Sequence, residues 1–283
     1  MNPMSRPFPI AMIPYANMAP FQQMGPPEGC AFAECFPRQS IQALKEKRVW
    51  AAAVPVGGLP LLRDETRFLG SYGIAVKERA MSVLFFSDRP FEQFRRPLTI
   101  GLTGESASSV RLLYLLLGYQ NGFQGVPRLA PPGRTGNGYL VIGDRALQWA
   151  RDFERTGAVH GFTHVTDLAV LWYQRFRLPF VFARWVVHNQ APAAVKEILQ
   201  AWLQRFSQAE PGLIARAAPR VARRLGLSHA YAERYLKVIR RCLAAEDEAG
   251  QRRFQEELQP HGSGPLFETA TPTELPTDPQ EGT

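Results

Sequence analysis

The sequence predicts an α/β fold, and three features support this class. Short apolar, β-branched segments alternate with segments of helical periodicity along most of the chain. The 283 residues suffice for one large or two medium domains with real cores. The chain shows no internal repeat. Alternation of this kind is typical of α/β layers with largely parallel sheets.

The elements follow from runs of β-branched and apolar residues for strands and from periodic apolar residues for helices. Strands are predicted at 8–15, 49–59, 72–77, 81–87, 97–102 and 178–188, and a strand, a turn and a helix within 137–153. Helices are predicted at 38–47, 110–120, 167–176, 192–208 and 248–258, with two basic helices within 216–241. The segment 262–283 is rich in Pro, Thr and Glu and is predicted to be a disordered tail.

Three serines stand where the strand at 97–102 passes into the helix at 110–120. Serine hydroxyls at such a junction accept hydrogen bonds from free backbone N–H groups and act as N-caps. A helix N-terminus also suits a carboxylate or phosphate. One serine is enough for a cap, so Ser106, Ser108 and Ser109 leave donors for an anionic ligand.

Two further polar residues follow predicted strands. Asn17 comes after the strand at 8–15, and Asp144 follows the apolar run "LVIG". In open α/β sheets, ligands bind beyond the carboxyl ends of the strands. We therefore expect Asn17, the three serines and Asp144 to share one edge. The alternative for Asp144 is that it caps the helix that follows it.

The chain carries a net charge of +8, and much of it lies within 216–241. A basic run can bind nucleic acid, but it more often forms one solvated helical face, and Tyr231 and Tyr235 give little aromatic interleaving for base stacking. We expect no nucleic-acid partner, although a basic chain attracts small anionic metabolites. The basic residues are Arg216, Arg220, Arg223, Arg224, Arg234, Lys237, Arg240 and Arg241.

Cysteine and histidine usage indicates neither a metal site nor a disulfide framework. Cys30, Cys35 and Cys242 lack zinc-ligand spacing, and their odd number argues against a disulfide scaffold. His160 and His164 lie four residues apart in a poor helix former, without an HExxH motif. No apolar stretch is long enough to span a membrane, and the N-terminus lacks the apolar run of a signal peptide. These features predict a cytoplasmic protein without a metal.

Five motifs occur in an order that resembles a known family. The motifs are "IPYANMAPF" (13–21), "MSVLFFS" (81–87), "GESASSVRLLYLLL" (104–117), "VIGDRAL" (141–147) and "DLAVLWYQRFRLPFVFARW" (167–185). Together they resemble the menaquinone-biosynthesis family of the futalosine route, in particular its chorismate dehydratase branch. The resemblance covers residues 8–240.

The resemblance implies a type 2 periplasmic-binding-protein-like fold, in which two α/β lobes close over a ligand. The implied lobes are 1–96 together with 188–258, and 97–187. It also implies a carbon–oxygen lyase that removes water from chorismate and gives 3-[(1-carboxyvinyl)oxy]benzoate. Chorismate has two carboxylates, which fits a basic chain with an anion-ready helix. No cofactor is implied, because aromatisation of the ring drives the step.

The family motifs also imply roles for single residues. The three serines at the helix start bind one carboxylate, and Ser82 lies beside the substrate. Asn17 is the implied catalytic residue, because its amide can hold the leaving hydroxyl or orient the enolpyruvyl arm. Asp144 is a further candidate for substrate binding.

The reaction needs a base for the ring proton on the ether-bearing carbon, and the motifs offer no obvious one. One hypothesis is that the substrate's own enolpyruvyl carboxylate takes the proton while the protein orients it. Loss of a single protein carboxylate, such as Asp144 or Glu105, would then leave substantial turnover.

Two alternatives stay open at this point. One is a non-catalytic protein on the same fold that binds an aromatic or anionic metabolite. The other is the sister enzyme that forms 1,4-dihydroxy-6-naphthoate, which would need a histidine base at His160 or His164. The chain departs from the family pattern at several positions that bear on the substrate more than on the fold, namely Trp50, Ala107, Ser108, Thr166, Phe176 and Arg177.

Overall fold

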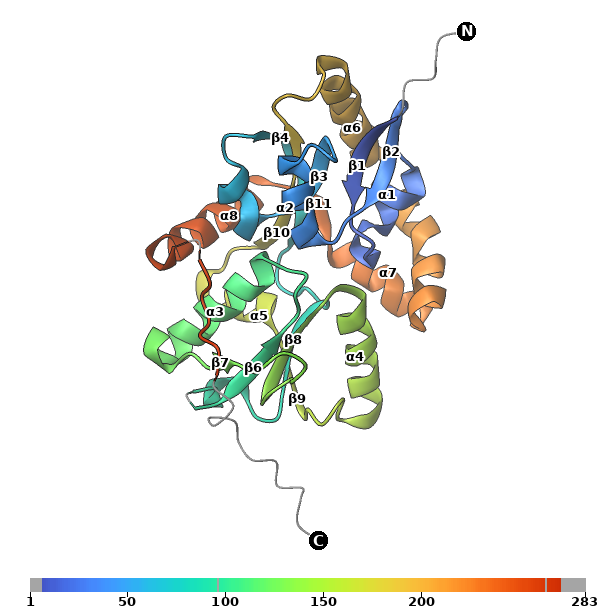
Figure 1. Ribbon diagram of the computed structural model, residues 1–283. Helices are drawn as coiled ribbons and strands as arrows, with labels where there is room; N and C mark the ends of the chain where they lie inside the picture. Colours follow the sequence, from blue (N-terminus) through green and yellow to red (C-terminus); the bar gives the residue numbers. More distant parts are fainter. Residues whose placement is uncertain (1–6, 96, 263, 271–283) are drawn as a thin grey trace.

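The computed structural model describes residues 7–95, 97–262 and 264–270, and it consists of two lobes built on two β-sheets (Figure 1). The six-stranded sheet has the order β11–β4–β10–β3–β1–β2, and the five-stranded sheet has the order β7–β6–β8–β5–β9. The strands of the first sheet are β1 (Phe8–Met12), β2 (Cys30–Glu34), β3 (Ala51–Pro55), β4 (Thr66–Val76), β10 (Phe180–His188) and β11 (Arg240–Cys242). Those of the second are β5 (Val83–Ser87), β6 (Thr99–Leu102), β7 (Arg128–Leu129), β8 (Gly138–Ile142) and β9 (His164–Asp167).

Helices cover both sheets, and short 3-10 helices lie between the strands and α-helices along the chain. The α-helices are α1 (Ala19–Met24), α2 (Pro37–Lys45), α3 (Ser108–Asn121), α4 (Gly143–Thr156), α5 (Leu168–Phe176), α6 (Ala193–Leu225), α7 (His229–Val238) and α8 (Ala245–Leu258). The 3-10 helices are η1 (Ala16–Met18), η2 (Val56–Leu62), η3 (Phe91–Gln93), η4 (Phe123–Gly125) and η5 (Gln259–His261). The predicted α/β class is confirmed, with layers of helices packed against each sheet.

The sheets are mixed, so the expectation of largely parallel sheets is wrong. β1 pairs in parallel with β2 and β3, but β10 runs antiparallel to β3 and β4. In the second sheet β6 and β8 are parallel, whereas β5 is antiparallel to both of its neighbours. The strands that enter from the other lobe, β5 and β10, both run antiparallel to their neighbours, and β11 is also antiparallel to β4.

The lobe boundaries also differ from those predicted. Strand 83–87 belongs to the five-stranded sheet, and strand 180–188 belongs to the six-stranded sheet. The chain therefore crosses between lobes after β4 and again after α5, rather than at 96/97 and 187/188. The boundaries implied by the resemblance are wrong at these points, because β4 and β5 are adjacent in sequence but each pairs with strands far along the chain, in different sheets.

The C-terminal segment forms a third crossing in the described chain. After η5 it runs from α8 past α3 to the five-stranded lobe (Figure 1). There Leu129 N donates to Glu268 O at 2.7 Å, and Ala270 N donates to Leu129 O at 2.8 Å. Phe267 and Ala270 are buried. The prediction of a disordered tail is therefore wrong for 264–270, and residues 271–283 lie outside the described residues.

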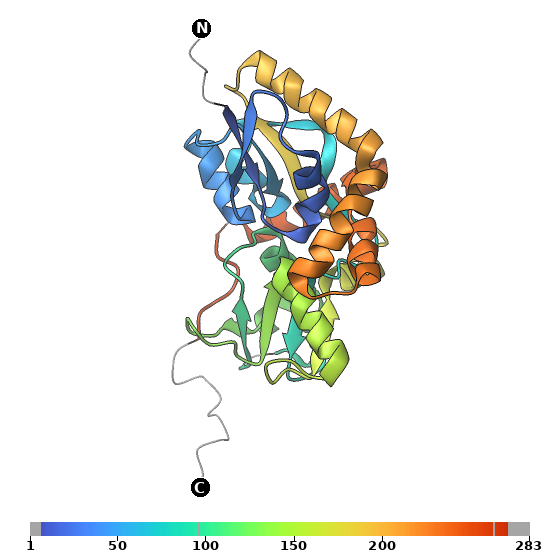
Figure 2. The same ribbon diagram turned by 90° about the vertical axis from the view of Figure 1, so that its right-hand side faces the viewer.

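The core of the six-stranded lobe is an aromatic cluster under α1 and α6. Phe21 lies against Trp185 and Trp202, with ring centroids 5.4 Å away in both cases. The long helix α6 contains Pro211 and Pro219, where two helices had been predicted. Both prolines are on the exposed side of α6, so water can satisfy the carbonyls that they leave unpaired. Figure 2 shows that α6 bends as it follows this lobe.

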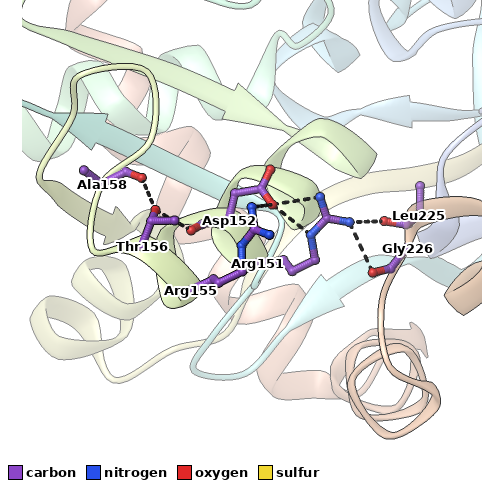
Figure 3. Close-up of polar contacts among 7 residues, drawn as sticks. All are labelled: Arg151, Asp152, Arg155, Thr156, Ala158, Leu225 and Gly226. Carbon is purple, nitrogen blue, oxygen red and sulfur yellow. Dashed lines mark hydrogen bonds and ion pairs between the residues drawn. The ribbon is translucent and has the colours of Figure 1, made fainter.

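A side-chain contact joins the lobes between α4 and the end of α6 (Figure 3). Arg151 on α4 donates through Nη1 to the carbonyls of Leu225 and Gly226, at 3.0 and 3.1 Å. These carbonyls end α6, and the dipole of a helix favours a cation at that end. Asp152 accepts from the same guanidinium, which fixes its orientation. No helix in the described part of the chain is long and apolar enough to cross a membrane.

Candidate active site

A small pocket lies where the two lobes meet. Its volume is about 60 Å³, far below the range of about 300–1,000 Å³ of drug-sized ligand sites, so a ligand of that size enters only if the lobes part. Five of the six predicted site residues line it, and they come from three segments of the chain: Asn17, Ser82, and the serines at the start of α3, which are Ser106, Ser108 and Ser109. Of the residues expected to share one edge, Asn17 and the three serines of α3 meet in this pocket, and Asp144 does not line it.

Asn17 lies in η1, directly after β1. Its backbone oxygen accepts a hydrogen bond from Arg241 Nε at 3.0 Å. Its side-chain Oδ1 is buried and has no hydrogen-bond partner among the described residues. An unpaired buried amide oxygen is costly, and a ligand that donates a hydrogen bond would satisfy it.

The three serines at the start of α3 have different contacts. Ser106 Oγ accepts from Ser109 N at 2.9 Å and so caps the helix, as predicted for one of the serines. Ser108 Oγ donates to Phe182 O at 2.8 Å and accepts from Gly57 N at 3.1 Å, which ties α3 to the six-stranded lobe. Ser109 is buried and lines the pocket. All three serines at the start of α3 thus line the pocket, and a helix start is a favourable place for an anion.

Ser82 precedes β5, in the first segment that crosses between the lobes. The backbone before it is fixed by Asp167, whose carboxylate accepts from Ala80 N and Met81 N at 3.0 and 2.8 Å. Met81 has φ of 61°, which a non-glycine residue adopts only when its surroundings hold it. Burial raises the pKa of the Asp167 carboxyl, while the N–H groups of Met81 and Ala80 act against this shift. Sequence analysis placed Asp167 only at a helix start.

Tyr15, two residues before Asn17 in the sequence, also lines the pocket. Its hydroxyl donates to the Glu105 carboxylate of the opposite lobe. Burial, and then the hydrogen bond from Tyr15 to Glu105, raise the pKa of the phenol well above its ordinary value. The ring of Tyr15 also lies against Gly143, where φ is 64° and an added Cβ would be 2.9 Å from the ring. Glycine in the "IGD" motif is thus required for this lobe contact.

Asp144 does not line the pocket. Its carboxylate accepts from Ala16 N at 2.7 Å and pairs with Arg224 Nη2 at 2.6 Å. Burial raises the pKa of this carboxyl, against the effect of Ala16 N–H and Arg224. The residue thus links α4 to the loop before Asn17, and we assign it to the lobe contact rather than to direct substrate binding.

A larger groove of about 990 Å³ lies outside this pocket, between η2 and α8. Gly57 lines the groove and Ser108 lines the pocket, and their hydrogen bond lies between the two spaces. None of the predicted site residues lines the groove. We place the candidate active site in the smaller pocket, where the polar groups converge.

The histidines considered as alternative bases lie away from the pocket. His164 begins β9 and pairs with Ser87, at the opposite end of β5 from Ser82. The ring of His160 is 4.3 Å from that of Trp149. Neither histidine lines the pocket. Among the described residues, no group of three or more His, Cys, Asp and Glu side chains could hold a metal ion.

Comparison with known proteins shows which family the chain belongs to. The family model described as menaquinone biosynthesis matches residues 8–259. The chain belongs to this menaquinone-biosynthesis family. Within the family it is similar to a protein of Thermus thermophilus named chorismate dehydratase, with 31% identity over 268 residues that cover 89% of this chain and 96% of that protein.

Solved structures show the fold of this family member. Protein AF1704 from Archaeoglobus fulgidus has a TM-score of 0.65 and 15% identity, over 91% of this chain and 98% of that one. The alkanesulfonate-binding protein SsuA from Xanthomonas axonopodis pv. citri, bound to MOPS, has a TM-score of 0.60 and 14% identity, over 90% and 92%. A Candida albicans protein described as having the generic periplasmic binding protein fold has a TM-score of 0.56 and 9% identity, over 97% and 99%. The periplasmic-binding-protein-like fold is confirmed.

Proposed function

We propose that this chain is a chorismate dehydratase, a lyase that converts chorismate into 3-[(1-carboxyvinyl)oxy]benzoate and water. The observation that carries the proposal is the interlobe pocket that gathers Asn17, Ser82 and the serines of α3. The similarity to the Thermus protein named chorismate dehydratase supports this choice of substrate. The predicted cytoplasmic location stays a prediction.

The pocket offers binding and orientation rather than a protein base. The N-terminus of α3, with Ser106 and Ser109, would hold a substrate carboxylate, and Asn17 Oδ1 would accept a hydrogen bond from the ring hydroxyl. Among the described residues, the pocket lining contains no His, Lys, Asp or Glu. Tyr15 lines it, but its raised pKa makes it a poor base.

These features support substrate-assisted elimination. The enolpyruvyl carboxylate takes the proton from the ether-bearing ring carbon, the C–H electron pair becomes the new ring π bond, and the neighbouring C–O bond breaks. The hydroxyl leaves with one proton as water, and the ring becomes aromatic. The protein contributes by orientation, which can supply a large part of a rate enhancement. The sister reaction receives less support, because its candidate bases His160 and His164 lie away from the pocket.

The test is to mix the purified protein with chorismate and to follow the loss of diene absorbance, with mass analysis of the product. We expect a product lighter by one water. Asn17→Ala should lower kcat/KM on the order of 100-fold, the scale seen when one preorganised polar group is removed. Asn189→Ala, on the exposed turn after β10, is the matched control and should retain activity.

Two results would overturn the proposal. Unchanged chorismate with a protein that chorismate stabilises against heat would indicate a binding protein on this fold. Unchanged chorismate without stabilisation would mean that another small molecule is the substrate.

A further inference from the structure

A helix from the basic C-terminal region backs the pocket. Helix α7 packs beside η1 and α6 and places Tyr235 behind Ser82. Tyr235 has no exposed surface and does not line the pocket. The basic run that contains it had been expected to form a solvated face. A fully buried tyrosine in this place needs a partner for its hydroxyl, because an unpaired buried O–H is costly.

That partner is Ser82. Tyr235 Oη donates to Ser82 Oγ at 3.0 Å, and both side chains are buried. A phenolic O–H has one proton to donate, and Ser82 Oγ is its hydrogen-bond acceptor within the described chain. Because Ser82 Oγ is the acceptor in this bond, the bond restricts the direction in which the serine can donate its own proton.

A serine hydroxyl has one proton and two lone pairs. Because Ser82 Oγ accepts from Tyr235, one lone pair is used and the serine proton must point elsewhere. In the protein its acceptor is Ala80 O, at 3.4 Å, which is long for an O–H···O bond. A ligand oxygen in the pocket could provide a better acceptor for this proton.

We propose that Tyr235 is a positioning residue that orients Ser82 so that the serine hydroxyl donates its proton into the pocket. This proposal rests on the proposed function, and it explains how the hydroxyl of Ser82 is oriented toward the substrate. Ser82 would meet a substrate carboxylate or ether oxygen as a donor. Burial raises the pKa of the Tyr235 phenol, so the phenol remains a donor at any pH at which the enzyme would work.

The test is a double-mutant cycle of Tyr235→Phe and Ser82→Ala with chorismate. Tyr235→Phe removes only the phenolic oxygen and should lower kcat/KM about three- to tenfold, which corresponds to one hydrogen bond between neutral groups. In the Ser82→Ala background the same change should alter kcat/KM less than twofold, because its target is gone. Tyr231→Phe, one turn earlier on α7 and half-buried, is the matched control and should retain activity.

Equal losses in both backgrounds would overturn the proposal, because a merely structural role of Tyr235 does not depend on Ser82. No loss from Tyr235→Phe, together with a loss from Ser82→Ala, would overturn it as well.

Crystal structures of the unmodified protein and Tyr235→Phe separate this proposal from the proposed function. Ser82 Oγ should turn away from its position beside residue 235 in the variant. An unmoved hydroxyl would overturn the positioning role even if chorismate is the substrate. If the unmodified protein leaves chorismate unchanged, the proposed function fails, and the position of Ser82 Oγ alone decides the role of Tyr235.

Discussion

The two lobes support their sides of the pocket in different ways. On the five-stranded side, the cap of α3 is local, because Ser106 caps a helix whose first residues line the pocket, while Ser108 adds hydrogen bonds to the other lobe. On the six-stranded side, Asn17 depends on residues far away in sequence. Arg241 holds its backbone oxygen, and Glu210 holds Arg241 through an ion pair at 2.9 Å. A substitution at the helix cap should therefore affect mainly the start of α3. A substitution in the chain of contacts behind Asn17 should affect both the pocket and the stability of the six-stranded lobe.

The largest expected effect therefore falls on Arg241. Its side chain is fully buried, and it donates to Asn17 O, Leu236 O and Ile239 O as well as to Glu210. Arg241→Met should lower the free energy of unfolding by about 3–5 kcal/mol, because Glu210 and these carbonyls lose their partner. Urea unfolding followed by circular dichroism measures this, and Arg220→Met on the exposed face of α6 is the control.

Equal unfolding midpoints for the two arginine variants would contradict this comparison. A second variant separates the charge from the packing. Adding Glu210→Gln to Arg241→Met removes the unpaired carboxylate and should restore part of the lost stability.

A smaller effect is expected on the locally organised side. Ser106→Ala removes the cap of α3 and should cost about 1 kcal/mol of stability. Ser109→Ala keeps the cap but removes a hydroxyl that lines the pocket, so it should raise KM for chorismate with little change in the unfolding temperature. Thermal unfolding and steady-state kinetics on both variants test whether Ser106 serves stability while Ser109 serves binding. Similar destabilisation by both variants with unchanged KM would show that the serines serve only the helix.

The same contrast explains what the sequence could predict. The serine junction was predictable, because capping and anion binding at a helix start depend on residues within one turn. The exposed positions of Arg216, Arg220 and Arg234 agree with the predicted solvated face. Arg241 ends the same run but is buried, because Glu210 and three backbone carbonyls surround its guanidinium. No local pattern reveals partners of that kind.

Local sequence patterns also could not predict which strands belong to which lobe or which residues make contacts between the lobes. Strands β5 and β10 pair with strands far along the chain, so no local pattern assigns them to their lobes, and the boundaries implied by the resemblance place both in the wrong lobe. Tyr15 stands two residues before Asn17 in a motif already noted, but its partner Glu105 lies in the other lobe. Of the departures from the family pattern, Ser108 lines the pocket, whereas five others lie outside its lining, namely Trp50, Ala107, Thr166, Phe176 and Arg177.

A third effect, on the free energy of unfolding, should appear only at high pH. The pKa of Tyr235 is raised in the folded protein, so the unfolded chain loses this proton first, above about pH 10. The contribution of the protonated phenol to stability is complete below that pH and falls as the pH rises further, by at most about 1.4 kcal/mol per pH unit. Tyr235→Phe should therefore lose stability less steeply than the unmodified protein between pH 10 and 11. Parallel curves in urea unfolding would show that Tyr235 titrates normally.

The smallest effect is expected at the contact between α4 and the end of α6, which lies apart from both supports of the pocket (Figure 3). Arg151 is 40% exposed, and Gly226 is exposed, so water can replace the hydrogen bonds that Arg151→Ala removes. The loss of stability should stay below about 1 kcal/mol, and kcat/KM should remain within twofold. Arg155→Ala, 76% exposed on the same helix, is the control. A loss of activity from Arg151→Ala as large as that from Asn17→Ala would show that this contact holds the lobes in the reactive arrangement, and the pocket would then depend on long-range support on both of its sides.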